Sequence, residues 1–212
     1  MNYAAACKVT KSPQEVQTNN QSQDTVLPSR PTVTIKQSTT RFKLDEASKC
    51  KNSPGSRICT AYVICTINNE HYVLTHKRSR VMTNPLLYCS AGGSIDQGEN
   101  SYNAALRELR EETGFSNPPD GYLFFTTNQT KVAANYIFFC ELEQIRNGVK
   151  GPSGEFKKEI DMDATFSDLK NVINLPNTGH CLMPIKNNLD HPNLYNFFKQ
   201  NCEYILNFIL SL

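Results

Sequence analysis

Short apolar stretches rich in β-branched and aromatic residues, bounded by polar turn residues, predict several strands between residues 57 and 90 and again after residue 120. "RICTAYVICTI" (57–67) and "HYVLTHK" (71–77) are separated by the turn residues "NNE", which predicts a β-hairpin. Leu86–Ser90 predicts a third short strand, which leads into a glycine loop. "GYLFFTT" (121–127) and "KVAANYIFFCELE" (131–143) predict two more strands.

Two other segments have apolar residues at helical spacing. Asn100 and Ser101 are good N-cap residues and Gly114 is a natural stop, so Ser101–Thr113 is predicted to be a helix. Its apolar stripe, which we expect to pack on the core, consists of Tyr102, Ala105, Leu106, Leu109 and Thr113. After Pro192, apolar residues recur at helical spacing: Leu194, Phe197, Phe198, Ile205, Phe208, Ile209 and Leu212.

A helix between strands, with a terminal amphipathic helix behind them, predicts an α/β or α+β sandwich. The segment "DATFSDLKNVINL" (163–175) is ambiguous, because its first residues indicate a strand and "FSDLKNVI" indicates a short helix. We see no internal repeat in the sequence.

The N-terminal quarter has a different composition. Residues 1–55 are predicted to form a flexible, basic, polar tail, and residues 56–212 the folded domain. Residues 1–52 contain 8 Lys and Arg against 4 Asp and Glu, whereas the rest contains 14 against 16. The tail is interpreted either as a solubilising extension or as a segment attracted to RNA. "TVTIK" (Thr32–Lys36) alternates like a strand that could join the domain edge.

Cysteine usage and hydropathy exclude some classes of protein. The eight cysteines form no C-x-x-C pair and no cluster of zinc spacing, which favours reduced thiols in a cytoplasmic protein over a secreted disulfide framework. No apolar run approaches the roughly 20 residues of a membrane span, so we expect a soluble protein without a membrane partner. The sequence does not indicate an oligomeric state.

The densest cluster of charge lies in "GGSIDQGENSYNAALRELREETGF" (92–115). Glu108 and Glu112 are spaced i, i+4 and Glu111 follows Glu108 at i+3, so three carboxylates share one flank of the predicted helix. Arg107 can reach Glu111 but cannot neutralise all three. A solvated charged face would be the ordinary interpretation of such a helix. Gly92, Gly93 and Glu99 stand just before it, however, and clustered hard oxygens suit Mg²⁺ or Mn²⁺.

This segment resembles the complete signature of the Nudix (MutT-like) hydrolases, G-x5-E-x7-R-E-U-x-E-E-x-G-U, in which U is a bulky apolar residue. The match runs from Gly93 through Glu99 and Arg107 to Phe115, and every fixed position agrees. The resemblance implies a Nudix-type α/β/α sandwich with a mixed β-sheet and a C-terminal helix. It also implies a divalent-metal-dependent pyrophosphohydrolase that cleaves a diphosphate linkage in a nucleoside diphosphate derivative, with a small-molecule nucleotide as substrate.

Carried onto this chain, the signature assigns roles to individual residues. Glu108, Glu111 and Glu112 become metal ligands, while Glu99 helps to build the box or reaches the metal. Arg107 pairs with a carboxylate and fixes the loop. Gly93, beside Gly92, lets the backbone approach closely, because glycine lacks a Cβ.

The general base is left open between a box glutamate such as Glu108 and a carboxylate from a later loop. Glu155 and Glu159, in "GPSGEFKKEID", are the loop candidates, and each is equally well interpreted as an ordinary loop charge. Lys77 and Arg78, with Arg80 beyond them, follow the second strand and are candidates for binding substrate phosphate.

Two other functions stay open from the sequence. The basic tail keeps an mRNA-cap-hydrolysing enzyme, with capped RNA as its partner, as an alternative. A Nudix-fold module that binds a nucleotide or RNA without turnover is the alternative of another class; the presence of all box glutamates favours the enzyme. No feature of the sequence after the box identifies a substrate subfamily.

Overall fold

The protein is described by a computed structural model, which covers residues 35–37, 42–43, 55–119, 121–128 and 131–212. The chain divides into two units, residues 1–32 and residues 33–212, and every described residue belongs to the second unit.

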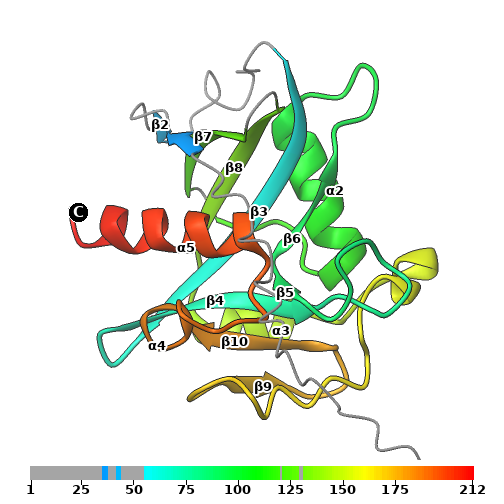
Figure 1. The fold of residues 1–212 in the computed structure, drawn as a ribbon, viewed down its shortest axis with the longest axis vertical. Helices are drawn as coiled ribbons and strands as arrows, with labels where there is room; N and C mark the ends of the chain where they lie inside the picture. Colours follow the sequence, from blue (N-terminus) through cyan, green and yellow to red (C-terminus); the bar gives the residue numbers. More distant parts are fainter. Residues whose placement is uncertain (1–34, 38–41, 44–54, 120, 129–130) are drawn as a thin grey trace, which may run out of the picture. The chain divides into compact units, whose positions relative to one another are not determined.

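The strands of this unit form one mixed sheet (Figure 1). They are β1 (Ile35–Gln37), β2 (Phe42–Lys43), β3 (Ser56–Ile67), β4 (Glu70–Lys77), β5 (Tyr88–Cys89), β6 (Ala91–Ser94), β7 (Gly121–Asn128), β8 (Lys131–Phe139), β9 (Ile173–Leu175) and β10 (His180–Pro184). The main path runs β1-β7-β8-β3-β4-β10-β9, with β2 paired to β7, β5 to β4 and β6 to β3. The pair β3–β8 is parallel, and the other pairs are antiparallel.

The helices cover both faces of this sheet (Figure 1). They are α2 (Ser101–Thr113), α3 (Leu142–Gly148), the 3-10 turn η1 (Gly154–Lys158), α4 (Ile185–Asn188) and α5 (Asn196–Ile209). Side chains of the central strand β3 alternate between two cores. Ala61 and Val63 pack with α2 and α3, whereas Tyr62 and Ile64 pack with α4 and α5. This arrangement confirms the predicted α/β/α sandwich with a C-terminal helix.

The predicted hairpin is confirmed, with Ile67 opposite Glu70 at its tip. Asn68 and Asn69 both adopt positive φ angles, 49° and 62°, which asparagine tolerates better than most residues and which fit a tight hairpin turn. The predicted strand 86–90 is shorter than expected. Beyond it, the segment that we expected to be a glycine loop forms strand β6 and pairs with β3.

Two other expectations need correction. The long strand predicted for 131–143 ends at Phe139, because the last residues begin helix α3, in which the Gln144 side chain caps the backbone N–H of Glu141. In the ambiguous segment 163–175 only β9, at its end, is regular, and no helix forms there. Strand β10 and helix α4 were not predicted. The helices Ser101–Thr113 and 196–209 are confirmed, the first with its predicted bounds.

Most of the predicted tail 1–55 lies outside the described residues. Within it, β1 and β2 pair with β7, and β1 overlaps the segment "TVTIK" that could join the domain edge. The boundary at residue 55 stays a prediction.

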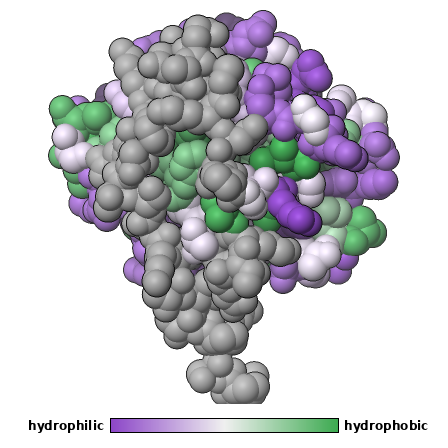
Figure 2. Space-filling model, turned by 90° about the horizontal axis from the view of Figure 1, so that it is seen from above, coloured by the Kyte–Doolittle hydropathy of each residue, from purple (hydrophilic) through white to green (hydrophobic). Residues whose placement is uncertain are grey.

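The surface in Figure 2 is mostly hydrophilic on its right-hand side, with apolar residues gathered in smaller patches. Large apolar side chains that are mainly exposed among the described residues include Val81, Leu210 and Leu212. None of the helices in the described ranges is both long and apolar enough to cross a membrane. The six described cysteines are free and buried: Cys59, Cys65, Cys89, Cys140, Cys181 and Cys202.

Candidate active site

Helix α2 carries the predicted carboxylates, and local signals fix both of its ends. The Asn100 side chain accepts a hydrogen bond from the Asn103 N–H at 2.8 Å. Gly114 takes a left-handed conformation with φ 73° and donates its N–H to the Arg110 carbonyl at 2.8 Å. These caps set the rotation and length of the helix, and thereby the direction in which its glutamates point.

The buried face of α2 is wider than its apolar stripe. Glu108 and Glu112 are each only 6% exposed, so they lie inside the protein and not beside the core on an open flank. Ionised carboxylates are almost never buried without partners. The burial of these two side chains therefore excludes the interpretation of this helix face as a solvated surface.

Strand β6 is the element that covers them. A Cβ atom at Gly93 would stand 2.7 Å from Glu108 Cδ, so only glycine leaves room for this carboxylate. The Gly92 N–H donates to Glu112 Oε2 at 3.1 Å. At Gly92 an added Cβ would meet the Cys59 carbonyl oxygen of β3 at 2.6 Å. The glycine pair is thus required for close packing of the helix, β6 and β3.

Arg107 joins the other carboxylates of the box. Its guanidinium donates to Glu99 Oε2 at 3.1 Å, to Glu108 Oε1 at 2.9 Å, and to Glu111 Oε2 at 3.0 Å. It also donates to the Ser94 carbonyl at 2.9 Å, at the end of β6. The hydrogen bonds that Arg107 donates to the carboxylates, that to Glu99 first, raise the pKa of Arg107, which stays charged. The Arg107 side chain therefore links the loop at Glu99, the end of β6 and helix α2 through hydrogen bonds.

The positive charge around Glu108 and Glu112 is too small to offset the effect of burial on the two carboxyl groups. Burial raises the pKa of the Glu112 carboxyl well above its usual range, and the charges of Glu108 and Glu159 raise it further. The Gly92 N–H and Arg78 oppose this effect. Burial also raises the pKa of Glu108, against the hydrogen bond and charge of Arg107. A cation bound here would favour the ionised form of both groups.

The two loop glutamates that we considered as bases lie in different surroundings. The Glu155 side chain is 74% exposed and pairs with Lys158 at 3.6 Å. Glu159 is half-buried, and its charge acts on both Glu108 and Glu112. Backbone hydrogen bonds hold its segment, from Ser153 N–H to the Glu111 carbonyl at 2.8 Å and from Ser79 N–H to the Glu159 carbonyl at 2.9 Å. Glu159, and not Glu155, acts on the carboxylates of α2.

A cavity of about 350 Å³ opens beside the glycine pair, and both Gly92 and Gly93 line it. Arg78 also lines it and donates through Nε to the Thr83 carbonyl at 3.0 Å. Lys77 is not among the lining residues; its ammonium group lies 5.4 Å from the centre of the Tyr88 ring. Of the three cations considered for phosphate binding, Arg78 therefore lines the cavity, and Lys77 and Arg80 do not.

The carboxylates fit a divalent cation by their chemistry. Oxygen ligands in a charged, partly desolvated setting suit Mg²⁺ or Mn²⁺, and the raised pKa values of Glu108 and Glu112 reflect a shortage of positive charge. In the part of the chain that the structure describes, no three His, Cys, Asp or Glu side chains are arranged to hold a metal as they stand. The Glu111 carboxylate, the next ligand candidate, is bonded to Arg107.

Several cavity residues were not predicted from the sequence. Ser90, Tyr195 and Phe197 line the cavity from the β5–β6 junction and the start of α5. Phe197 was predicted only as part of the apolar stripe after Pro192, and Tyr195 was not singled out. A half-exposed Phe197 within that stripe cannot be distinguished from a core residue until the neighbouring strands are placed.

Solved structures of low sequence identity are similar to this chain. A C. elegans Ap4A hydrolase in a binary complex matches with a TM-score of 0.45 and 10% identity, over 74% of this chain and 100% of that one. The NUDIX domain of Shewanella oneidensis NrtR, complexed with ADP ribose, matches with a TM-score of 0.46 and 15% identity, over 78% and 99%. A mutT/nudix family protein from Listeria innocua matches with a TM-score of 0.44 and 17% identity, over 75% and 99%.

Comparison with family models and with curated proteins gives one further finding. No curated protein matches the sequence. The family model of the NUDIX domain matches residues 59–164, which is half of the chain. This match spans β3 to the segment after η1 and includes the whole box, the glycine pair and Glu159. The chain belongs to the NUDIX family and is a Nudix hydrolase, an enzyme that acts on phosphoanhydride bonds.

Proposed function

We propose that the protein is a divalent-metal-dependent pyrophosphohydrolase that cleaves a diphosphate linkage in a nucleoside diphosphate derivative. The observation that carries this proposal is the pair of buried carboxylates, Glu108 and Glu112, that abuts the glycine wall of the cavity with too little positive charge around it. A substrate diphosphate in this cavity would lie against the same backbone that contacts both carboxylates.

Glu108, Glu111 and Glu112 would hold Mg²⁺ or Mn²⁺. When bound, such a cation supplies charge neutralisation on the diphosphate and lowers the pKa of an attacking water. Glu99 accepts hydrogen bonds from Arg107 and from the Asp96 N–H at 3.3 Å, so its role in this proposal is to hold the loop.

The chain's own groups complete the chemistry. Glu159 would accept the proton of the attacking water, since its charge already acts on the two buried carboxylates. Arg78 would bind a phosphate oxygen at the cavity. Arg107 would keep Glu111 and the loop in place.

The decisive experiment is the substitution Glu112→Gln, which removes the charge and keeps the size. Release of a nucleoside monophosphate should fall by about 1000-fold or more, because the cation contributes several kcal/mol to transition-state stabilisation. Mn²⁺ should raise the melting temperature of the wild type and raise that of the variant much less, since a ligand of the native state stabilises it. The fold should survive, because a buried charge is removed.

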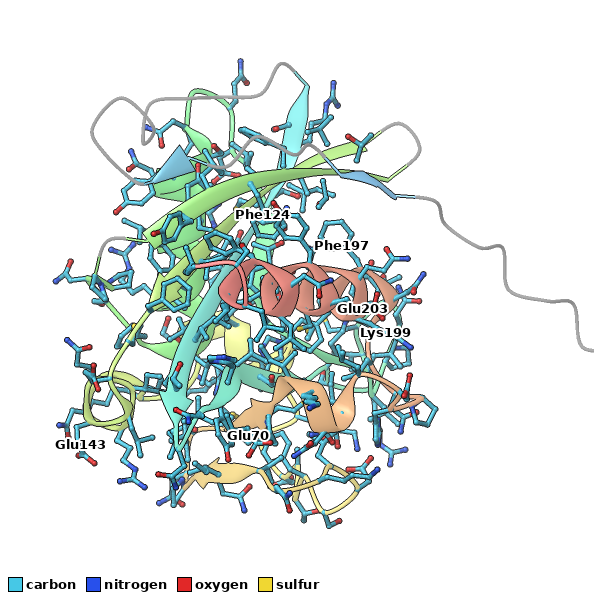
Figure 3. All side chains as sticks on the ribbon, turned by 90° about the vertical axis from the view of Figure 1, so that its left-hand side faces the viewer. Glu70, Phe124, Glu143, Phe197, Lys199 and Glu203 are labelled. Carbon is cyan, nitrogen blue, oxygen red and sulfur yellow. The ribbon has the colours of Figure 1, made fainter. Side chains whose placement is uncertain are left out.

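The matched control is Glu143→Gln, on α3. The Glu143 side chain is 70% exposed and pairs at the surface with Arg146, and Figure 3 shows it at the periphery of the molecule. This variant should equal the wild type in turnover and in its Mn²⁺ shift. Equal turnover and equal shifts in wild type and Glu112→Gln would remove Glu112 from the metal site and overturn the mechanism.

The substrate itself is identified by a panel. ADP-ribose, diadenosine tetraphosphate, a nucleotide sugar and capped RNA should each be assayed with Mg²⁺ and with Mn²⁺. Turnover of capped RNA alone would replace the small nucleotide by the cap as substrate. Binding without turnover of any member would favour the non-catalytic module.

A further inference from the structure

The cavity beside the box has an aromatic wall, and one of its side chains, Phe197, belongs to neither core. Helix α5 contributes two consecutive phenylalanines to this wall, and their surroundings differ. Phe198 is buried and stacks on Tyr62 with ring centroids 6.2 Å apart and planes 2° apart. Phe197 is half-buried, belongs to neither core cluster, and has no ring partner among the described residues, yet it lines the cavity.

No other ring of the described residues stacks on Phe197, so the side chain can present a face to a ligand in the cavity. Phe197 and Lys199 are two residues apart on α5 and leave the helix on opposite sides, with Phe197 toward the sheet (Figure 3). Tyr195, the N-cap residue of α5, adds a second half-exposed ring to the same wall. Aromatic rings of this kind stack on planar ligand rings.

The same cavity contains a buried hydroxyl group. Ser90 is 7% exposed, and its Oγ is buried with the Tyr62 hydroxyl as a polar neighbour, which it helps to hold against the rise in pKa that burial causes. A buried hydroxyl in a cavity wall can donate to or accept from the edge of a ligand, and the free-energy cost of burying it is offset when a ligand does so.

The charges of the side chains that line the cavity restrict the chemical class of ligand that can bind there. Arg78 is the cation among the cavity residues, and the other lining side chains are neutral. A polyphosphorylated ring such as an inositol polyphosphate would need several cations here. A flat, uncharged ring with hydrogen-bonding edges fits a wall that combines aromatic side chains with hydroxyl and amide groups such as those of Thr60, Thr83 and Asn84.

We infer that the cavity holds the nucleobase of the substrate, stacked on Phe197, with Ser90 Oγ at its edge and the phosphates directed past Arg78 to the box. Helix α5 and the β5–β6 junction are thereby the elements that determine substrate specificity. This inference rests on the proposed function for the direction of the phosphates. The base site itself can be tested by binding alone.

The lack of tryptophan in the sequence makes a direct optical test possible. The substitution Phe197→Trp introduces a single reporter on the proposed stacking wall. ATP, GTP, CTP and UTP are titrated in EDTA and, separately, in Mn²⁺, and inorganic tripolyphosphate serves as the probe without a base. At least one ribonucleotide should change the emission saturably, and tripolyphosphate should not. The control Glu203→Trp places the reporter on an exposed position of the same helix, labelled in Figure 3, and should not respond.

Steady-state kinetics provide a second test of the base site. Phe197→Ala should raise KM for the preferred nucleotide roughly 10- to 100-fold, the range expected for loss of one base-stacking contact. Turnover of tripolyphosphate, which contains phosphoanhydride bonds but no base, should not change. Phe197→Tyr keeps the ring and should stay within a few fold of the wild type.

The outcomes separate the two proposals. A saturable nucleotide response at position 197 without any hydrolysis by the wild type would support the base site and refute the pyrophosphohydrolase. Hydrolysis by the wild type with no response at position 197 and an unchanged KM in Phe197→Ala would refute the base site and leave the enzyme intact. An equal response to tripolyphosphate and to nucleotides would also refute it, because position 197 would then report the phosphates.

Discussion

The two faces of the sheet both bury polar side chains, but in opposite ways. On the α2 face, Glu108 and Glu112 are carboxyl groups whose pKa values are raised, because burial outweighs the effect of their positive partners. On the α5 face, the Asn201 amide donates to the Tyr62 hydroxyl at 2.7 Å and to Asn135 Oδ1 at 3.0 Å. Asn135 in turn donates to Thr126 Oγ1 at 3.0 Å.

The difference separates a site from a scaffold. Neutral amides joined in a chain fix the position of α5 on β3 and β8 through hydrogen bonds within the protein, although Asn201 Oδ1 has no hydrogen-bond partner among the described residues. Carboxylates left with excess charge create a requirement that a ligand can fulfil. Burial alone does not distinguish the two faces; the balance of charge and partners does.

The largest effect that would sharpen this contrast is expected at Glu159, the third acidic group of the charged region. Glu159→Gln should lower both kcat and kcat/KM by about 10²- to 10⁴-fold, the contribution of a positioned general base. Glu155→Gln, at an exposed position of η1, should leave both unchanged. Equal losses in the two variants would show that the loop needs charge in general and that neither group is the base.

On the α5 face, a substitution in the amide network should lower the stability of the protein and leave its turnover unchanged. Asn135→Leu leaves the Asn201 amide and the Thr126 hydroxyl without their partner, which should lower the free energy of unfolding by about 2–3 kcal/mol. Denaturant unfolding measures the loss, and kcat at 25 °C should stay near the wild-type value. Asn207→Leu, at an exposed position of α5, should change stability by less than about 0.5 kcal/mol. If Asn135→Leu lost activity without losing stability, the division between the faces would fail.

A third class of buried polar group, the neutral imidazole, gives a smaller, pH-dependent effect. Burial lowers the pKa of His180 to about 4, so the folded protein keeps this ring neutral where the unfolded chain, with a pKa near 6.5, takes up a proton. Stability contributed by His180 is therefore present above about pH 6.5 and is lost as pH falls toward 4. The free energy of unfolding of the wild type minus that of His180→Gln should decrease by about 1.4 kcal/mol per pH unit over this range. A difference that is independent of pH would show that His180 is protonated in the folded state.

Local signals explain which parts of the molecule the sequence predicts well. The cap residues Asn100 and Gly114 determine α2, and Asn68 and Asn69 determine the β3–β4 turn, without any help from distant residues. Strand β10 offers no comparable signal, because five residues between a glycine and a helix gain strand structure only by pairing with β4 and β9.

The residues of the active site also divide into those that the sequence predicts and those that depend on contacts between distant segments. The spacing from Gly93 to Phe115 identifies the carboxylates and Arg107, but periodicity places Glu108 and Glu112 beside the core, whereas β6 buries them. The choice of Glu159 over Glu155 and the aromatic wall at Phe197 depend on segments that meet only in the folded protein. Sequence spacing within one helix is fixed by its geometry, and contacts between separate loops are not.

The parallel pairing of β3 with β8 has a consequence for how the protein folds. Partners such as Ser56 and Val132, or Ile64 and Phe139, are about 75 residues apart, and the whole box lies within the loop that this pairing closes. Closing so long a loop is entropically slow, and folding rates fall as such distant pairings increase. Helix α2 can begin to form early from its own caps, but its glutamates lose their water only when β3 is in place between β6 and β8. The charge imbalance of the site is therefore expected to arise late in folding, after the energetically favourable collapse of the two cores is under way.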